Sequence, residues 1–254
     1  FPKKKIDFLI LITQTSPYRI PTTACILQNK MGLKKNTIAF DINLGCSGFV
    51  YGLMVADSIL RANNYNKGIL VCVDTYSKYI SRNDRTCRPL FSDAASATLI
   101  TSSKERTVGP FILGTDGSGY QDLIVKNSGT KKNTNIGRNL LHMNGSEVFM
   151  FTMRTVPKVV HNLLEKEKCD IEDIDLFVFH QASKLVLDNI KRLLKLSSEK
   201  IFENYHLVGN TVSSSIPIAL SQAKDKNIIK KGSVVMVVGF GVGLSWGATL
   251  IRYN

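Results

Sequence analysis

Two stretches of this chain carry the same order of residue types, and they limit its fold more than any other feature. The stretch Ile6-Asp-Phe-Leu-Ile-Leu is matched in kind by Ile174-Asp-Leu-Phe-Val-Phe, 168 residues further on. Each is followed by a turn that leads into a helix, at Cys46 in the first case and at Asn210 in the second, and then by an apolar run. We therefore expect two copies of one βαβ-rich unit.

The residues between these landmarks have the pattern of an α/β protein. Continuous apolar runs predict strands at 6–13, 37–43, 68–74, 95–101 and 233–238. Helical spacing appears over 22–33, where Thr22 or Thr23 is a candidate cap, and over 147–164. The polar stretch 126–137 predicts an exposed crossover. The predicted organisation is a first half at 1–108, a crossover and loop region at 109–145 and a second half at 146–254.

The repeat also predicts that the first half is shorter at its start. About 30 residues of helix and turn precede the strand at Ile174, whereas five residues precede Ile6. The chain opens at Phe1, without a methionine. We therefore expect it to begin inside its first domain, with the N-terminal part of the first half missing.

Cys46 stands where the β-like run from Asp41 turns into an apolar helix. A thiol at that position faces unpaired N–H groups and the positive end of the helix dipole, which favour the thiolate. Gly45 and Gly48 leave room for a bend and for close approach of a substrate. The residue type alone favours a structural role instead, because a free cysteine usually behaves as a small buried hydrophobic residue. Residues downstream decide in favour of a nucleophile.

A histidine and an asparagine occupy comparable places in the second half. The apolar run Phe177-Val-Phe ends in His180, and Val208-Gly leads to Asn210 at another turn into a helix. Cysteine, histidine and asparagine at three strand or turn ends form a candidate site for covalent catalysis. Surface or structural roles are expected for His142, His161, His206, Cys25, Cys72 and Cys169.

Composition excludes several classes of protein. With 44% hydrophobic and 21% charged residues the chain is globular, and no apolar run approaches the roughly 20 residues of a membrane span. Five cysteines without a C-x-x-C pair argue against a disulfide framework and a zinc site, and favour the cytoplasm.

The formal net charge of +13 fits nucleic acid, an acidic carrier protein or an anionic coenzyme A thioester. The basic residues are scattered, with short clusters only at Lys3-Lys-Lys5 and Lys131-Lys132. Because no nucleic-acid-binding motif accompanies them, we expect no nucleic-acid partner.

Seven motifs, in this order, resemble those of the β-ketoacyl-[acyl-carrier-protein] synthase III family of the thiolase superfamily. They are Ile20-Pro-Thr-Thr-Ala-Cys25, Asn43-Leu-Gly-Cys-Ser-Gly-Phe49, Leu90-Phe-Ser-Asp-Ala-Ala-Ser-Ala97, Met143-Asn-Gly-Ser-Glu-Val-Phe149, His180-Gln-Ala-Ser183, Gly209-Asn-Thr211 and Gly239-Phe-Gly-Val-Gly-Leu-Ser-Trp-Gly247. The resemblance covers essentially all 254 residues. It implies a thiolase-like five-layered αβαβα fold and a homodimer.

The resemblance also assigns roles. Cys46 would take an acyl group from an acyl-CoA thioester. His180 and Asn210 would bind the malonyl thioester carbonyl as carbon dioxide leaves, and Phe240 would line that site. A second oxyanion hole would come from the backbone of Cys46 and of the Gly241-Val242-Gly243 turn, where Val242 replaces the family's middle glycine and is expected to alter the pocket's shape. No cofactor is implied.

Contacts with partners are implied as well. Leu185 stands where the family often has an arginine for the acyl-carrier protein, and the predicted basic docking face on the same helix consists of Lys184, Lys191, Arg192 and Lys195. A solvated helix surface is the alternative for these four residues. Ile20 falls where one subunit reaches the acyl pocket of its partner.

Other functions stay open at this point. One is an acyltransferase of the same fold that forms an ester or an amide. A hydroxymethylglutaryl-CoA synthase-like enzyme would need a carboxylate base, but the stretch 6–21 offers Gln14 and no glutamate. A basic protein that keeps the fold and only binds acyl groups or acidic proteins is the alternative from another class.

Overall fold

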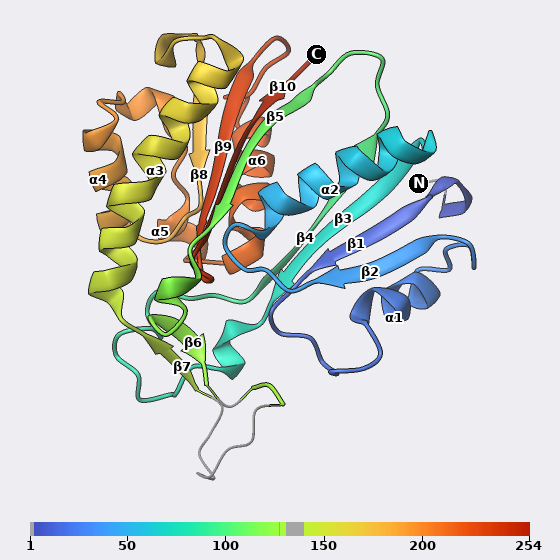
Figure 1. The fold of residues 1–254 in the computed structure, drawn as a ribbon, viewed down its shortest axis with the longest axis horizontal. Helices are drawn as coiled ribbons and strands as arrows, with labels where there is room; N and C mark the ends of the chain where they lie inside the picture. Colours follow the sequence, from blue (N-terminus) through green and yellow to red (C-terminus); the bar gives the residue numbers. More distant parts are fainter. Residues whose placement is uncertain (1–2, 127, 131–139) are drawn as a thin grey trace.

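Two four-stranded sheets form the framework of the molecule in a computed structural model that describes residues 3–126, 128–130 and 140–254 (Figure 1). The first sheet has the order β2-β1-β3-β4, and its strands are β1 (Phe8–Ile12), β2 (Ile38–Ile42), β3 (Lys67–Asp74) and β4 (Ala94–Thr101). Strand β1 pairs in parallel with β2 and β3, and β4 runs antiparallel to β3.

The second sheet repeats this plan. Its order is β5-β10-β9-β8, with strands β5 (Val108–Thr115), β8 (Leu176–Phe179), β9 (Val234–Gly241) and β10 (Ser245–Arg252). Strands β8, β9 and β10 correspond to β1, β3 and β4, because β8 is parallel to β9 and β10 is antiparallel to it. Strand β5 lies antiparallel on the other side of β10, so the second sheet starts at Val108 and its first strand runs into the segment 109–145 that was expected to be a crossover.

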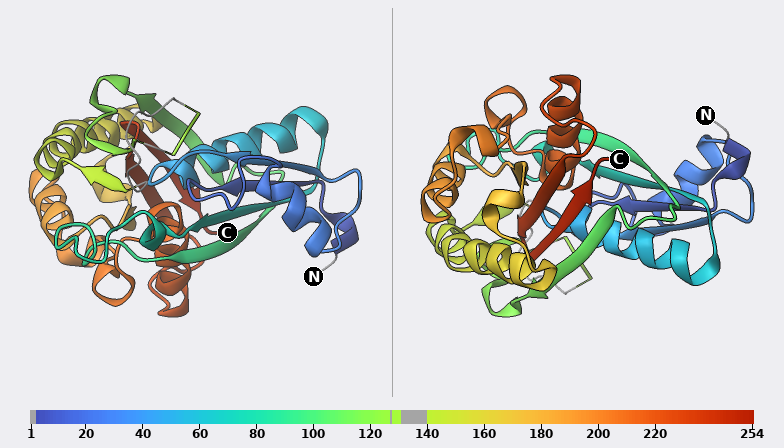
Figure 2. Two further views of the ribbon diagram at one scale, coloured as in Figure 1. Left: turned by 90° about the horizontal axis from the view of Figure 1, so that it is seen from below. Right: turned by 90° about the horizontal axis from the view of Figure 1, so that it is seen from above.

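Six helices complete the layers that Figures 1 and 2 show. They are α1 (Thr23–Lys30), α2 (Gly48–Asn63), α3 (Gly145–Glu167), α4 (Lys184–Leu193), α5 (Tyr205–Val208) and α6 (Ser215–Asp225) in the described part of the chain. Helix α1 packs on the outer face of the first sheet, α2 and α6 lie between the sheets, and α3 and α4 cover the second. The predicted five-layered αβαβα fold is confirmed.

A small third sheet lies beside the ends of the main ones. It pairs β6 (Leu123–Val125) with β7 (Leu141–Met143). Most of the predicted crossover 126–137, including Lys131-Lys132, lies outside the described residues.

The main core fills the space between the two sheets. Phe8, Ile10 and Ile12 point into it from β1, and Leu176 and Val178 point into it from β8. All residues of β1 and β8 are buried, because helices cover both faces of these strands, and this explains their uninterrupted apolar sequences. Strand β4 differs from that pattern, since every second residue along it is exposed.

Helix α1 is capped by a residue from a neighbouring strand. The predicted caps at its first residues make no side-chain cap hydrogen bond. Instead, the carboxylate of Asp41 in β2 accepts the backbone N–H groups of Thr23 and Ala24, each at 2.7 Å. A negative charge at this end of a helix also interacts favourably with the helix dipole.

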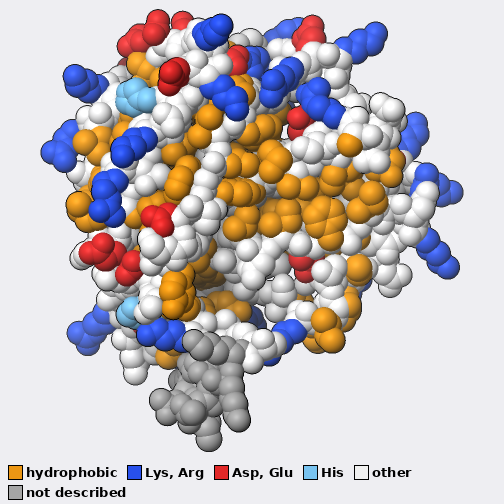
Figure 3. All heavy atoms as spheres, viewed as in Figure 1, with side chains coloured by type: hydrophobic (Ala, Val, Ile, Leu, Met, Phe, Trp, Pro, Cys, Tyr) orange, Lys and Arg blue, Asp and Glu red, His pale blue; other side chains and the backbone are white. Residues whose placement is uncertain are grey.

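Figure 3 shows where apolar and charged side chains gather on one face of the molecule. Hydrophobic side chains cover much of the area over α2 and the strands beside it. Lysine and arginine side chains are spread around the rim and form no continuous stripe on this face. The positive net charge is therefore not concentrated here as a nucleic-acid-binding surface would require.

Candidate active site

One cavity of about 480 Å³ brings together the three side chains proposed for catalysis, Cys46, His180 and Asn210. Cys46 lies two residues before α2, His180 directly follows β8, and Asn210 lies in the turn between α5 and α6. Residues from both halves of the repeat therefore meet in one place. Phe240 and Gly241 at the end of β9 also line the cavity.

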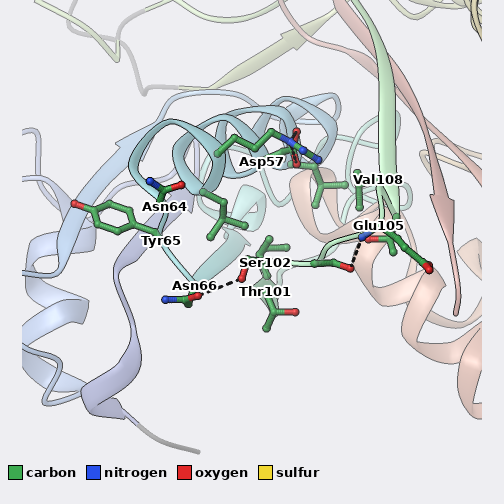
Figure 4. A pocket seen from close by; sticks show the side chains of 14 residues that line it. Asp57, Asn64, Tyr65, Asn66, Thr101, Ser102, Glu105 and Val108 are labelled. Carbon is green, nitrogen blue, oxygen red and sulfur yellow. Dashed lines mark hydrogen bonds and ion pairs between the residues drawn. The ribbon is translucent and has the colours of Figure 1, made fainter.

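A second cavity, of about 340 Å³, lies at the other end of α2 (Figure 4). Asp57, Asn64 and Tyr65 line it from α2 and the turn that follows, opposite Ser102 and Glu105 from the connection between β4 and β5. No cysteine or histidine is among its described lining residues. It lacks a nucleophile of the kind found at Cys46, so the first cavity is the candidate active site.

The Cys46 thiol is enclosed by the turn that ends β9. Cys46 is 5% exposed, and a Cβ atom on Gly241 would lie 2.9 Å from its sulfur. Gly241 has a φ of +154°, so both space and backbone conformation call for glycine. Hydrogen bonds from the backbone N–H groups of Val242 and Cys46 lower the pKa of the thiol, so both groups lie close to the sulfur.

The protonation state of Cys46 differs from the expectation based on the helix. Burial raises the pKa of the thiol to about 12, and the carboxylate of Asp74 raises it too, whereas the backbone N–H groups lower it. Desolvation of the anion thus outweighs the favourable end of α2. The resting site holds a thiol at neutral pH, and a base must accept its proton during attack.

His180 is buried and oriented by a serine that the sequence reasoning did not identify. Its Nδ1 lies 2.6 Å from Oγ of Ser215 at the start of α6. Burial lowers the pKa of His180 to about 3, so the ring is neutral, and the edge of the Phe240 ring packs against it at 5.5 Å between centroids. With Nδ1 engaged, Nε2 is the ring nitrogen left for a substrate.

Replacing Ser215 with alanine is expected to reduce turnover about fivefold to tenfold, because one hydrogen bond of about 1 kcal/mol then no longer orients His180. Steady-state assays of the purified variant would measure the loss. Ser214→Ala is the matched control, since Ser214 is equally buried but its Oγ bonds the carbonyl of Cys72. Equal losses in both variants would show that Ser215 only supports packing.

Asn210 is held at both its backbone and its side chain. Its N–H donates to the carbonyl of Leu90 at 2.8 Å, and its carbonyl accepts the N–H of Ser92 at 2.9 Å. Its Oδ1 accepts the N–H of Val212 at 3.0 Å, which leaves the amide nitrogen free to donate. His180 and Asn210 can therefore offer two neutral donors to one cavity.

The structure separates the remaining predicted residues into two groups. Val242 packs against the apolar cluster that contains Cys46, and Gly243 follows it in the turn between β9 and β10. Ile20 is 86% exposed and is absent from the lining of the Cys46 cavity. Its predicted role in a partner subunit stays a prediction.

The predicted docking face on α4 is partly neutralised by acidic neighbours. Lys184 pairs with Asp188 at 2.5 Å, and Lys191 lies 3.8 Å from the same carboxylate. Arg192 donates to Asn189, and Lys195 follows the end of the helix. Leu185 is exposed and lines the rim of the Cys46 cavity from this helix.

A more strongly basic loop borders the same cavity and was missed in the sequence. Arg82, Arg85 and Arg88 line one hollow of about 700 Å³, while Thr86 and Leu90 of the same loop line the Cys46 cavity. None of the three arginines has an ion pair within the described ranges. Their spacing of three residues is the sequence signal that could have identified them.

The fold and the cavity define the class of this protein, which is that of thiolase-fold acyl-transferring enzymes. Two family models match, 3-oxoacyl-[acyl-carrier-protein] synthase III at residues 40–117 and its C-terminal model at residues 164–253. The chain belongs to the 3-oxoacyl-[acyl-carrier-protein] synthase III family, whose members are also named β-ketoacyl-[acyl-carrier-protein] synthase III.

Individual relatives agree with this assignment. The chain is 38% identical to a β-ketoacyl-[acyl-carrier-protein] synthase III of Clostridium perfringens, over 98% of its own length and 78% of the relative's. A 2.1 Å crystal structure of a 3-oxoacyl-(acyl-carrier-protein) synthase III matches with a TM-score of 0.96 and 36% identity, covering 99% of this chain and 79% of the other. The Thermus thermophilus enzyme matches with a TM-score of 0.91 and 34% identity, over 98% and 78% of the two chains.

Proposed function

We propose that the chain catalyses the decarboxylating Claisen condensation of an acyl-CoA starter with malonyl-[acyl-carrier-protein]. The products are 3-oxoacyl-[acyl-carrier-protein], carbon dioxide and free coenzyme A, in fatty acid or related acyl-chain biosynthesis. The observation that carries this proposal is the single cavity that holds Cys46, His180 and Asn210. Family membership supports the same reaction.

Acyl transfer comes first. The sulfur of Cys46 attacks the thioester carbonyl of the starter, a new carbon–sulfur bond forms, and the bond to coenzyme A breaks. The backbone N–H groups of Cys46 and Val242 stabilise the oxyanion. The proton of the Cys46 thiol is transferred to the departing coenzyme A thiolate, which leaves as the free thiol.

Decarboxylation and condensation follow in the same cavity. His180 Nε2 and the Asn210 amide donate to the malonyl thioester oxygen, and each such donor contributes on the order of 3 kcal/mol to the enolate-forming transition state. Carbon dioxide leaves with cleavage of its carbon–carbon bond, and the enolate carbon attacks the acyl carbonyl. A carbon–carbon bond forms, the bond to sulfur breaks, and the Cys46 thiolate takes up a proton.

Basic surfaces around the cavity suit the two substrates. Arg82, Arg85 and Arg88 are suited to bind the phosphates of coenzyme A, because none of them has an ion pair among the described residues and their loop also lines the Cys46 cavity. The net charge of +13 favours an acidic carrier protein, for which α4 offers the docking face. The reaction needs no cofactor beyond these substrates.

A cytoplasmic site of action suits the thiol chemistry. All five cysteines are free, and Cys46 must stay reduced to act as a nucleophile. None of the helices in the described ranges has the length and hydrophobicity that a membrane span requires. Recovery of the enzyme with the membrane or extracellular fraction of its cell would contradict the cytoplasmic location.

A homodimer is proposed from the apolar surface and an open strand. Strand β2, which leads to Cys46, pairs only with β1 among the described strands, and hydrophobic side chains gather over α2 (Figure 3). The exposed Ile20 would then reach the second subunit. Sedimentation velocity should show a dimer of the unaltered protein. A charged residue in place of exposed Ile38 on β2 should weaken that dimer. A monomer in the unaltered protein would refute the proposal.

Intact mass spectrometry tests the reaction directly. The protein is incubated with a panel of acyl-CoA thioesters, and malonyl-[acyl-carrier-protein] is then added. An acyl adduct that disappears as a 3-oxoacyl product forms is expected. An adduct that malonyl donor leaves untouched would favour an ester- or amide-forming acyltransferase, and no adduct with any thioester would favour a binding protein.

The starter that this enzyme prefers is expected to be short. A cavity of about 140 Å³ lies beside Val242 and is lined also by Gln14, Tyr76 and Leu123. Its volume corresponds to about five water molecules at about 30 Å³ each. Two of these lining side chains are joined, because the Tyr76 hydroxyl donates to Gln14 Oε1 at 2.6 Å. We therefore expect two- and three-carbon acyl groups to be preferred over long alkyl chains.

Val242→Gly is therefore expected to shift selectivity toward longer starters. The ratio of kcat/KM for hexanoyl-CoA to that for acetyl-CoA should rise about tenfold or more, since each methylene accommodated changes discrimination by that order. Val242→Ala should give an intermediate ratio. An unchanged ratio in both variants would show that Val242 does not limit the starter.

A further inference from the structure

A buried carboxylate beside Cys46 has no role in the reaction described above. Asp74 ends β3 and has 0% exposure, and no lysine, arginine or histidine of the described residues pairs with it. Burial raises its pKa to about 6, so it is an anion in the neutral range at an energetic cost. Such a residue is expected to persist only where its charge or its geometry is used.

Hydrogen bonds from two other turns converge on this carboxylate. Oδ1 accepts the N–H of Gln14 at 2.8 Å, in the turn after β1. Oδ2 accepts the Oγ hydroxyl of Ser213 at 2.5 Å and the N–H of Ser213 at 3.3 Å. Asp74 thus joins the end of the first sheet to the turn that carries Asn210.

A strained residue lies between the Asp74 anchor and the Asn210 side chain. Val212 has a φ of +53°, which is a rare conformation for a β-branched residue and costs free energy. Its N–H binds Oδ1 of Asn210, and the next residue is Ser213. A turn of this kind persists only when the surrounding contacts hold it, and the contact with Asp74 is directly adjacent.

We propose that Asp74 is a positioning residue, which acts through Ser213 and the Val212 turn to aim the Asn210 amide at the malonyl thioester. This inference rests on the proposed condensation and deepens it. Asp74 itself touches neither the malonyl group nor the acyl group in this scheme.

The charge of Asp74 also affects the reactivity of Cys46, which can be measured independently of decarboxylation. Around the thiol and the carboxylate lie Tyr76, Cys72, Cys87 and His180. Burial raises the pKa of the tyrosine and of both cysteines and lowers that of His180, so all four are neutral at pH 8. Asp74 is therefore the one anion in this set, and after burial its charge is the next cause that raises the pKa of Cys46.

Two variants separate the geometry of Asp74 from its charge. Asp74→Asn removes the charge with little change of shape, and Ser213→Ala removes the hydroxyl contact while the charge stays. Asp7→Asn is the matched control, because Asp7 clamps the N–H groups of Asn66 and Lys67 at the opposite end of the same sheet. Each purified protein is assayed for decarboxylation of malonyl-CoA and for the pH dependence of Cys46 alkylation by iodoacetamide.

Both variants are expected to lose about tenfold in malonyl-CoA decarboxylation, because one of the two donors is misaligned. Only Asp74→Asn is expected to alkylate faster at pH 8, by about threefold or more, because the pKa of Cys46 falls when the neighbouring anion is removed. Asp7→Asn should behave as the unaltered protein in both assays.

Several results would overturn the proposal. Decarboxylation at the unaltered rate in both variants would show that Asp74 does not position Asn210. An equal loss of decarboxylation in Asp7→Asn would show that Asp74 contributes only to general stability. If the unaltered protein decarboxylates neither malonyl-[acyl-carrier-protein] nor malonyl-CoA, the condensation itself is refuted, and an unchanged alkylation profile in Asp74→Asn would then also refute the effect of the charge.

Discussion

Cys46→Ala is expected to abolish the acyl adduct and to lower condensation by at least about 1,000-fold, the scale on which loss of a catalytic nucleophile acts. The sulfur is the atom that receives the acyl group, and no other thiol lines the cavity with His180 and Asn210 in the described chain. Malonyl decarboxylation should continue in this variant, because its two donors remain in place.

Intact mass after incubation with acetyl-CoA measures the adduct, and release of labelled carbon dioxide measures decarboxylation. Cys87→Ala is the matched control, since Cys87 is buried in the same apolar cluster as Cys46 but is absent from the cavity lining. An acyl adduct on Cys46→Ala of the same yield as on the unaltered protein would place the nucleophile elsewhere.

Asn210→Ala is expected to have the opposite profile. The acyl adduct on Cys46 should still form, whereas malonyl decarboxylation should fall about 100-fold or more with the loss of a donor worth about 3 kcal/mol. The reason is that, in the proposed reaction, the free Asn210 amide nitrogen donates to the malonyl thioester, while backbone N–H groups bind the oxyanion of acyl transfer.

The two half-reactions are measured separately, as adduct formation and as carbon dioxide release. His180→Ala should share the profile of Asn210→Ala, because in the proposed reaction neutral His180 donates to the enolate oxygen and not to the oxyanion of acyl transfer. Asn63→Ala at the exposed end of α2 is the surface control. Proportional loss of both half-reactions in Asn210→Ala would contradict its assignment to the malonyl donor.

Much of the fold could be predicted from local pattern. Strands β1, β3 and β9 were expected from their apolar runs, and α2 from the turn at Cys46. Such prediction works because a buried strand or helix shows apolar residues at the spacing of its own secondary structure. The motifs around Cys46, His180 and Asn210 also indicated the family.

Strand β5 shows the limit of such prediction. Its sequence, Val-Gly-Pro-Phe-Ile-Leu-Gly-Thr, contains glycine and proline and was assigned to a crossover. Only its pairing with β10, far along the chain, makes it part of the second sheet. Residue type could not reveal this, because a strand's place in a sheet depends on a partner distant in sequence.

The sequence by itself determined the fold class, the family and the order of the candidate catalytic residues. The tertiary structure decided how those residues behave. Burial keeps Cys46 protonated although it precedes a helix, Ser215 orients His180, and Asp74 reaches the turn of Asn210 from another strand. Desolvation and hydrogen bonds depend on groups that meet only after folding, so neither can be deduced from a residue's neighbours in the chain.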